Sequence, residues 1–386
     1  MSLTDRWDSV LNELRRTGRY RDLAPPCGVD FSSNDYLGYA GGQRSSEPDA
    51  LARVTHSLAD ASGSDGICST ASRLLRGHHP VWDEVETKLA AWHGADAALM
   101  LTSGYIANEG LLSTVIGPGD WVASDECNHA SIIDGLRLAK ADKFVFRHRD
   151  VDHLESGLRD VARSRLAGRE LFVVTESLFS MDGDRAPLSA LAGLCTRFGA
   201  HLIVDEAHAT GCFGPAGGGC VGEAGLRRAV LATVHTGGKA MGVLGAYVCG
   251  SRRLRELLIN RCRHLIFTTA LPPVVGQWWL DALERVRRDG VGREALHGNA
   301  AFFRRELDRG GVAAAGSDYI VPVILHDDER AVRVAAELQR RGWDVRAIRP
   351  PSVPVGSARL RISIHADHDR ETLARLAAAV AELTST

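Results

Sequence analysis

The stretch that decides the fold is Leu202-Ile203-Val204-Asp205-Glu206-Ala207-His208, in which a short apolar run ends in two carboxyl groups and an imidazole. Six other short apolar runs have the same form, and stretches long enough for helices separate them: Ala97–Leu101, Trp121–Ala123, Phe144–Phe146, Leu171–Val174, Val230–Val234 and Gly245–Cys249. Runs that are apolar throughout are typical of strands buried on both faces of a parallel sheet. The sequence therefore predicts one large α/β domain with a seven-stranded, mostly parallel sheet covered by helices.

The sequence on either side of these strands predicts a different pattern of secondary structure. Residues 1–45 are expected to form an N-terminal arm with one helix, Trp7–Arg16, followed by a Pro/Gly-rich passage. Residues 46–273 are the expected large domain, and residues 274–386 a small α+β domain. The elements expected in the small domain are a helix, a strand, a helix, two strands and a helix: Val274–Arg309, Tyr319–Leu325, Ala331–Arg341, Asp344–Ile348, Leu360–Ile364 and Arg370–Leu383.

The composition excludes several classes of protein. The 386 residues include 46 Lys+Arg and 48 Asp+Glu, a net charge of -2 that argues against nucleic-acid binding. No apolar run approaches the roughly 18 residues of a membrane helix, and residues Met1–Trp7 lack the apolar segment of a signal peptide. The eight cysteines contain no C-x-x-C pair, and no Cys/His/carboxylate group shows metal-ligand spacing. We expect a cytoplasmic enzyme without a metal ion, a membrane span or a nucleic-acid partner.

Polar side chains follow four of the predicted strands, at the sheet edge where open α/β sheets bind ligands. These groups are Thr102–Tyr105, Glu176 with Ser180, Asp205 with His208, and His235–Lys239. Each alone is typical of a turn or a helix cap. Together they offer amides at a helix start for a phosphate, a carboxylate for a cationic ring nitrogen, and a lysine for an aldehyde. These are the requirements of pyridoxal phosphate.

From about residue 34 to near its C-terminus, the chain resembles the α-oxoamine synthase family of fold-type I pyridoxal-phosphate enzymes. The motifs that carry the resemblance are Ser33-Asn34-Asp35-Tyr36-Leu37-Gly38, Ser103-Gly104-Tyr105-x-Ala107-Asn108, Asn128-His129-Ala130-Ser131, Phe179-Ser180-Met181-Asp182-Gly183-Asp184, Asp205-Glu206-Ala207-His208-Ala209-Thr210-Gly211, Thr236-x-Gly238-Lys239, Phe267-Thr268-Thr269-x-Leu271-Pro272-Pro273 and Ile348-Arg349-Pro350-Pro351-Ser352-Val353-Pro354.

The resemblance implies three catalytic residues. Lys239 would hold the cofactor aldehyde and later move the α-proton of the substrate, Asp205 would pair with the pyridine nitrogen, and His129 would stack on the ring. The implied contacts to the rest of the cofactor are Ser180 and His208 near its phenolic oxygen, and Gly104, Tyr105 and Thr236 at its phosphate.

Two further implications concern the partner subunit and the substrates. Thr268 and Thr269, after a run at Leu265–Phe267 that we expect to be a strand, would reach the phosphate of the partner, so the active site would be shared within a homodimer. Besides His129, the implied substrate contacts are Asn34 and Arg361 at the amino-acid carboxylate, Ser352 where the family has a threonine, and Arg21, for which Arg19 is the alternative.

The resemblance also implies the reaction. It is a decarboxylative condensation of an amino acid, L-alanine, with pimeloyl-CoA or pimeloyl-acyl-carrier protein, as in the biotin branch of the family. The assignment of alanine depends on the segment Ile348–Pro351. Four departures bear on the acyl pocket, namely Cys68, Thr70 and Ala71 in place of glycines and Trp82 in place of a histidine. The alternatives are a family member that uses glycine, serine or another acyl chain, and a non-catalytic partner subunit.

Overall fold

The computed structural model describes residues 1–40, 68–164 and 169–385 of the chain. These residues belong to two compact units. The first unit consists of Met1–Tyr36, Ser180–Asp184 and Glu294–Thr386, and the second of Leu37–Phe179 and Arg185–Arg293. The domain boundaries predicted near residues 45 and 273 stay a prediction, and residue 45 itself lies outside the described residues.

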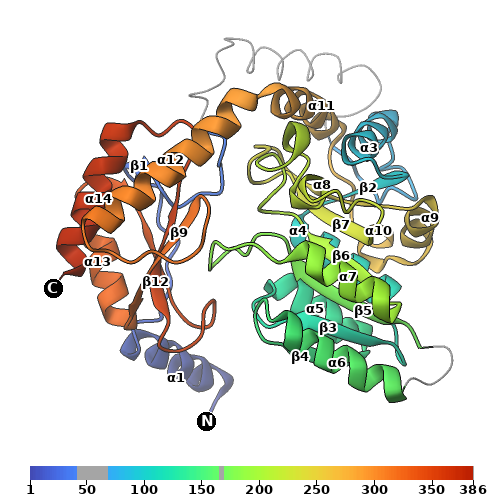
Figure 1. Ribbon diagram of the computed structural model, residues 1–386, viewed down its shortest axis with the longest axis horizontal. Coiled ribbons are helices and arrows are strands. Elements are labelled where there is room, and N and C mark those ends of the chain that lie inside the picture. The colour runs from blue at the N-terminus through green and yellow to red at the C-terminus, as the bar shows by residue number, and fades with distance from the viewer. Residues whose placement is uncertain (41–67, 165–168, 386) are drawn as a thin grey trace. The chain divides into compact units, whose positions relative to one another are not determined.

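The second unit is built on a seven-stranded, mostly parallel sheet, which confirms the predicted fold class (Figure 1). The strand order is β2-β8-β7-β6-β5-β3-β4, and only β8 runs against its neighbours β2 and β7. Each predicted run corresponds to one strand, and only Gly245 of the last run lies just outside its strand. The strands are β2 (Ala97–Leu101), β3 (Trp121–Asp125), β4 (Asp142–Phe146), β5 (Leu171–Glu176), β6 (His201–Asp205), β7 (Val230–Thr236) and β8 (Ala246–Gly250).

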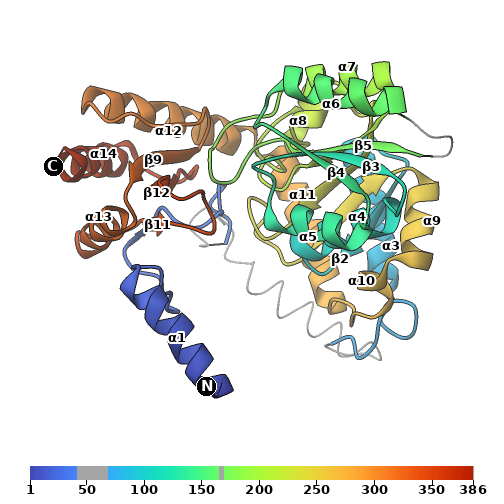
Figure 2. The same ribbon diagram turned by 90° about the horizontal axis from the view of Figure 1, so that it is seen from below.

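Helices cover both faces of this sheet, with α6 and α7 on one face and α4 and α5 on the other (Figure 2). The helices of the second unit are α3 (Pro80–His93), α4 (Gly104–Val115), α5 (Ala130–Ala139), α6 (Val151–Ser164), α7 (Leu188–Phe198), α8 (Cys220–Glu223), α9 (Arg252–Arg261), α10 (Arg263–Ile266) and α11 (Pro273–Arg288), with a 3-10 turn η1 at Pro215–Gly217. Apolar side chains of α4 and α5, such as Leu111 and Ile132, are buried against Val122 and Ile203 of the sheet. This burial, worth about 1.5–3 kcal/mol for each large side chain, fixes both helices with their N-termini at one sheet edge.

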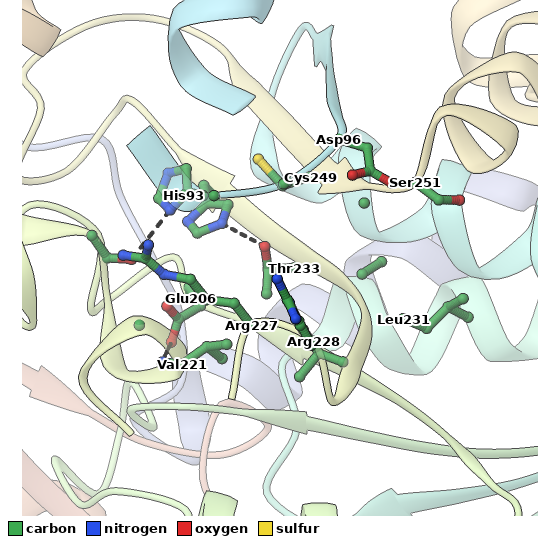
Figure 3. A pocket seen from close by; sticks show the side chains of 18 residues that line it. His93, Asp96, Glu206, Val221, Arg227, Arg228, Leu231, Thr233, Cys249 and Ser251 are labelled. Carbon is green, nitrogen blue, oxygen red and sulfur yellow. Dashed lines mark hydrogen bonds between the residues drawn. The ribbon is translucent and has the colours of Figure 1, made fainter. Parts of the chain in front are cut away.

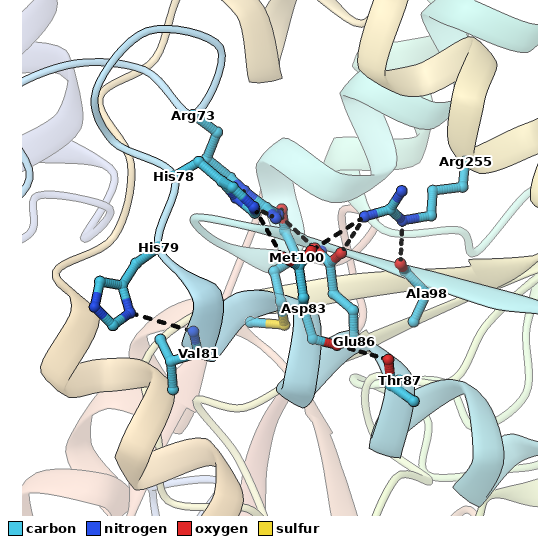
Figure 4. Close-up of polar contacts among 10 residues, drawn as sticks. All are labelled: Arg73, His78, His79, Val81, Asp83, Glu86, Thr87, Ala98, Met100 and Arg255. Atoms are coloured by element: carbon cyan, nitrogen blue, oxygen red, sulfur yellow. Dashed lines mark hydrogen bonds and ion pairs between the residues drawn. The ribbon is translucent and has the colours of Figure 1, made fainter.

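A buried carboxylate joins α3 to three other segments of the second unit (Figure 4). Glu86 of α3 is 3% exposed and forms ion pairs with Arg73 and with Arg255 of α9, the latter at 2.7 Å. Its Oε1 also accepts the backbone N–H of Met100 in β2 at 2.9 Å. Removal of this carboxylate would take the ion pair from Arg73 and would leave Arg255 with the more distant Asp83, at 3.9 Å. We therefore infer that Glu86 holds these segments in place.

We expect Glu86→Ala to lower the free energy of unfolding by about 3–5 kcal/mol, because it removes the ion pair of the largely buried Arg73 and the shorter of the two ion pairs of Arg255. The measurement is urea unfolding followed by circular dichroism. The matched control is Glu84→Ala on the same helix, where an exposed pair with Lys88 at 2.8 Å contributes about 0–1 kcal/mol. Equal stability of the two variants would contradict the structural role of Glu86.

The first unit contains two small sheets. One is antiparallel with the order β11-β12-β9, and the other pairs β1 with β10 in parallel. Its strands and helices are β1 (Val29–Asp30), β9 (Ile320–His326), β10 (Trp343–Asp344), β11 (Arg346–Ile348), β12 (Ala358–Ser363), α1 (Leu3–Arg16), α13 (Asp328–Arg340) and α14 (Arg370–Thr384), while α12 (Gly290–Arg309) begins at the end of the second unit. None of the helices in the described ranges has both the length and the apolar character needed to cross a bilayer.

The predicted strand at Leu265–Phe267 is wrong, because these residues form helix α10 and the turn that ends it. The N–H groups of Leu265 and Ile266 both bond to the carbonyl of Cys262 at 3.0 Å. Only Leu265 is buried, whereas Phe267 is 69% exposed, so the run lacks the two-faced burial of the true strands. An apolar run of three residues does not distinguish a strand from one turn of helix.

Two other predicted elements are interrupted. The helix expected over Val274–Arg309 breaks at Asp289, whose Oδ1 accepts the N–H of Gly292 at 2.7 Å, so α11 and α12 are separate helices. The strand expected over Asp344–Ile348 is divided at Val345, because β10 pairs with β1 whereas β11 pairs with β12.

Candidate active site

The carboxyl ends of β2, β5, β6 and β7 lie at the same edge of the large sheet, because these strands run in one direction. The predicted side chains follow these strand ends. The second unit therefore holds most of the predicted cofactor contacts: Gly104, Tyr105, His129, Asp205, His208, Thr236 and Lys239.

The first turn of α4 lies beside the end of β7. Ser103 caps this helix by accepting the N–H of Ile106 at 3.3 Å, and the N–H groups of Gly104 and Tyr105 are the first two of the helix, which have no carbonyl within it to bond. A Cβ atom at Gly104 would lie 3.5 Å from Cβ and Oγ1 of Thr236. Helix amides next to a hydroxyl form a suitable cradle for a phosphate.

Both oxygens of the Asp205 carboxylate accept hydrogen bonds. Oδ1 accepts the N–H of Ala207 at 2.8 Å, and Oδ2 accepts Nδ2 of Asn108 at 2.6 Å. The first bond is the turn-forming role that a lone aspartate at a strand end usually has. The second comes from α4 and has no such local role. Because the side chain is 6% exposed and accepts hydrogen bonds on both sides, its direction is fixed.

His129 is the N-cap of α5, and its backbone N–H donates to Oε1 of Glu176 at 2.6 Å. Burial lowers the pKa of His129, the Asp205 charge opposes this shift, and the Lys239 charge adds to it. Burial also raises the pKa of Glu176 well above its usual range, and the Asp205 charge raises it further. The charges of Asp205 and Lys239 therefore both act on His129 and on Glu176.

Lys239 stands in a tight loop between β7 and β8. The loop is closed by backbone bonds from Gly237 to Gly245 at 2.8 Å and from Gly242 to Lys239 at 2.9 Å. Gly237 must be a glycine, because a Cβ there would lie 2.3 Å from the carbonyl oxygen of Val243. The half-buried amine of Lys239 is 2.7 Å from Nε2 of His208. The loop thus holds an amine next to an imidazole at the carboxyl edge of the sheet.

Comparisons with known proteins agree with this arrangement. The family model for aminotransferase class I and II matches residues 28–380. An 8-amino-7-oxononanoate synthase of Chlorobaculum parvum is 44% identical over 360 residues, which are 92% of this chain and 90% of that relative. Another 8-amino-7-oxononanoate synthase, from Anaeromyxobacter dehalogenans, is 46% identical over 361 residues, which are 92% of this chain and 87% of that relative. The chain belongs to the α-oxoamine synthase family.

Solved structures of related enzymes have the same fold. A serine palmitoyltransferase of Sphingomonas wittichii matches with a TM-score of 0.88 at 30% identity, covering 99% of this chain and 98% of that one. An 8-amino-7-oxononanoate synthase of Francisella tularensis matches with a TM-score of 0.75 at 26% identity, covering 92% of this chain and 97% of that one. As a member of the α-oxoamine synthase family, this chain is an acyl-transferring enzyme that uses pyridoxal phosphate.

The residues of the second unit fit this cofactor. The amides of α4 beside Thr236 suit its phosphate, the fixed carboxylate of Asp205 suits a protonated ring nitrogen, and the amine of Lys239 suits its aldehyde. Of the other predicted contacts, Thr268 and Thr269 line a small separate cavity together with Arg73 and Trp82. Their reach toward a partner subunit stays a prediction.

The first unit holds the remaining predicted residues and brings two pairs of them together. Nη2 of Arg361 donates to Oδ1 of Asn34 at 2.9 Å, and Nε donates to the backbone oxygen of Ser180 at 2.6 Å. Nη2 of Arg21 donates to Oγ of Ser352 at 3.3 Å. Arg19 instead forms an ion pair with Asp328 at 2.8 Å. Which of the two arginines contacts the substrate stays a prediction.

Three of the four departures from the family pattern lie in the described segment before α3, and the fourth, Trp82, belongs to α3. Cys68 and Thr70 are exposed, and Ala71 accepts the N–H of Ala270 at 3.0 Å. Trp82 is 1% exposed and its Nε1 has no hydrogen-bond partner among the described residues. Trp82 therefore fills space next to Thr268 and Thr269 rather than supplying a hydrogen bond.

Three residues of the site had no role in the sequence-based prediction, namely Asn108, Ser131 and Glu176. Asn108 and Ser131 stood in the quoted motifs, and Glu176 follows a predicted strand. Their contacts to Asp205 and His129 became visible only once the helix faces were known.

A larger cavity, of about 400 Å³, lies at the opposite edge of the sheet, where β7 begins (Figure 3). His93, His235 and Cys249 meet there with their ligand atoms within 4.8 Å of one another. The two imidazoles stack at 3.9 Å and their nitrogens bond to Gly218, Tyr247, Thr210 and Thr233. Burial lowers the pKa of His93 to about 3, so these rings pack as neutral groups.

Proposed function

We propose that this enzyme condenses L-alanine with a pimeloyl thioester, either pimeloyl-CoA or pimeloyl-acyl-carrier protein, in biotin biosynthesis. The products are 8-amino-7-oxononanoate, carbon dioxide and the free thiol. The observation that carries the proposal is the group of Lys239, Asp205 and His129 at one sheet edge. It is supported by relatives named 8-amino-7-oxononanoate synthase at 44–46% identity. The cytoplasmic location predicted from the sequence stays a prediction.

The residues of the site divide the chemistry between them. When bound, pyridoxal phosphate would supply a ring that accepts electrons from the reacting carbon. The carboxyl group of Asp205, whose direction two donors fix, would hold the ring nitrogen in its protonated form. The amine of Lys239 removes the proton from Cα and returns a proton to the same carbon at the end.

The bonds made and broken balance as follows. A carbon–carbon bond forms between Cα of alanine and the acyl carbon, and the carbon–sulfur bond of the thioester breaks. The thiol leaves with one proton, and the carboxylate of alanine leaves as carbon dioxide. We assign the binding of that carboxylate to Asn34 and Arg361, and contacts with the substrates also to Arg21 and Ser352, because each pair lies together in the first unit.

The test is a product analysis by mass spectrometry with a panel of amino acids and acyl thioesters. We expect the fastest product formation from alanine with a pimeloyl thioester, supplied on CoA in one arm and on acyl-carrier protein in the other. Faster turnover of glycine or serine, or of a long acyl chain, would contradict the proposal.

A second candidate is another α-oxoamine synthase activity, with serine and a long-chain acyl thioester. The observation that favours it is the high structural similarity to serine palmitoyltransferase, with a TM-score of 0.88 over 99% of the chain. The same panel separates the two candidates. A non-catalytic subunit would show neither product nor the yellow cofactor colour that borohydride removes, and the presence of Lys239 argues against it.

We also propose that the enzyme is a homodimer in which Thr268 and Thr269 contact the cofactor phosphate of the partner. A Lys239→Ala chain mixed with a Thr268→Ala/Thr269→Ala chain would form heterodimers with one intact site. Random exchange would place half of the chains in heterodimers, so we expect about a quarter of the wild-type activity. The measurement is turnover after subunit exchange.

The control for this experiment mixes the Lys239→Ala chain with an Asp205→Asn chain. Both defects then belong to the site of their own chain, so no heterodimer contains an intact site and we expect no gain. A threonine double variant that is fully active by itself would overturn the shared site.

A further inference from the structure

A chain of buried hydrogen bonds connects Asp205 to His129 through two side chains without a role in the mechanism above. Nδ2 of Asn108 lies 2.6 Å from Oδ2 of Asp205 and 3.0 Å from Oγ of Ser131. Oγ of Ser131 lies 2.8 Å from Nδ1 of His129, and the backbone N–H of Ser131 donates to the same nitrogen at 3.2 Å.

The direction of every proton in this chain follows from its chemistry. The amide of Asn108 must present Nδ2 to Asp205, because its oxygen would repel the carboxylate at this distance. Both Nδ2 protons are then used, one by Asp205 and one by Ser131. Since Oγ of Ser131 accepts from Asn108, its only proton is left for Nδ1 of His129. Nδ1 thus accepts two hydrogen bonds, and the proton of the neutral imidazole lies on Nε2.

The packing of two helices fixes these distances. Asn108 is on α4 and Ser131 on α5, and the helices approach closely at Gly135, where a Cβ atom would lie 3.1 Å from Cα of Glu109 and 3.2 Å from the carbonyl oxygen of Asn108. Asn108 is 3% exposed and Ser131 is fully buried, so bulk water has no access to either group. In such a buried place the loss of one link leaves its neighbours without a partner.

We propose that Asn108 and Ser131 are positioning residues that hold His129 as the Nε2–H tautomer and tie its orientation to the Asp205 carboxylate. The proposal rests on the cofactor-binding function, in which His129 and Asp205 contact the same ring. Protonation of Nδ1 would point a proton at two donors and break the chain. Of the groups that face His129, the Asp205 charge favours protonation, Lys239 opposes it, Glu176 binds the backbone N–H, and the Tyr105 ring lies edge-on at 6.1 Å.

The main test compares Ser131→Ala with Ser113→Ala in the cofactor-loaded enzyme. Ser113 is a suitable control because, within the described part of the chain, its hydroxyl bonds only the carbonyl of Glu109 in its own helix. For Ser131→Ala we expect kcat to fall about tenfold, the size of one hydrogen bond to a charged or reacting group, with KM for the amino acid nearly unchanged. Nitrogen NMR of the labelled His129 side chain should show one tautomer in the wild type and in Ser113→Ala, and a mixture in Ser131→Ala. Ser131→Thr, which keeps the hydroxyl, should restore the single tautomer.

Two further outcomes separate this inference from the proposed function. If no amino acid and thioester give product but the tautomer still changes in Ser131→Ala, the inference stands and the proposed reaction falls. If condensation proceeds and Ser131→Ala and Asn108→Ala both keep the wild-type tautomer of His129, the inference is overturned. A wild-type enzyme with the His129 proton on Nδ1 would overturn it as well.

Discussion

Lys239→Ala is expected to abolish condensation while leaving the fold intact. The methyl side chain at position 239 of this variant has no amine to bond the cofactor aldehyde or to move the α-proton of the substrate. We therefore expect kcat to fall by at least about 10³-fold. The loop around residue 239 is closed by backbone bonds that alanine keeps, such as the N–H of Gly242 to the carbonyl at position 239. Loss of the bond to His208 should lower the free energy of unfolding by only about 1 kcal/mol. The measurements are thiol release for activity and thermal unfolding for stability.

The matched control for this variant is Lys88→Ala, which removes a lysine from an exposed pair with Glu84. It should be as active as the wild type. Condensation by Lys239→Ala at a rate near that of the control would contradict the assignment of the catalytic amine.

Asp205→Asn is expected to lower kcat by at least about 100-fold, because the ring nitrogen loses the charge that keeps it protonated. The variant also meets a second problem. Both oxygens of Asp205 accept hydrogen bonds, whereas an asparagine has only one acceptor and would face either Ala207 or Asn108 with a donor. We therefore expect a loss of stability of about 1–3 kcal/mol as well. Turnover, the visible spectrum of the cofactor and urea unfolding measure these effects.

Asp120→Asn serves as the control, because this carboxylate accepts the N–H groups of Gly117 and Glu170 just before β3 begins, at the sheet edge opposite the carboxyl ends of the parallel strands. It should lose stability without losing the cofactor spectrum. An Asp205→Asn enzyme with near wild-type turnover would mean that the cofactor ring lies elsewhere.

The strands of the large sheet could be predicted because each is an apolar run buried on both faces, such as Leu171–Val174 and Leu202–Val204. The order of the strands in the sheet could not be predicted. β8 lies between β2 and β7, and a local pattern does not say which distant strand a run will pair with. The prediction of a strand at Leu265–Phe267 was wrong for a related reason, since three apolar residues do not show which of their side chains will be buried.

The position of Asp205 and Lys239 at one edge of the sheet could be predicted, because the carboxyl ends of parallel strands meet there. Their catalytic roles stay a prediction. Ser131 and Asn108 are different. They lie on two helices, and their contacts depend on which faces of α4 and α5 meet. Which helix faces meet is decided by packing at residues such as Gly135, where α4 and α5 approach closely. The sequence motifs do not indicate how close the two helices come.

The strand order also determines when each strand can pair with its neighbour while the chain is being synthesised. Among the strands of the described residues, β2 has one neighbour in the sheet, β8, and about 150 residues separate their first positions, Ala97 and Ala246. At the roughly 5–20 residues per second of protein synthesis, β2 waits about 7–30 s for its partner to be made. During this time an apolar strand has an unpaired edge, which is a site for pairing with other chains. A ribosome-bound chain that ends before residue 246 should therefore be the most aggregation-prone stage in the production of this enzyme.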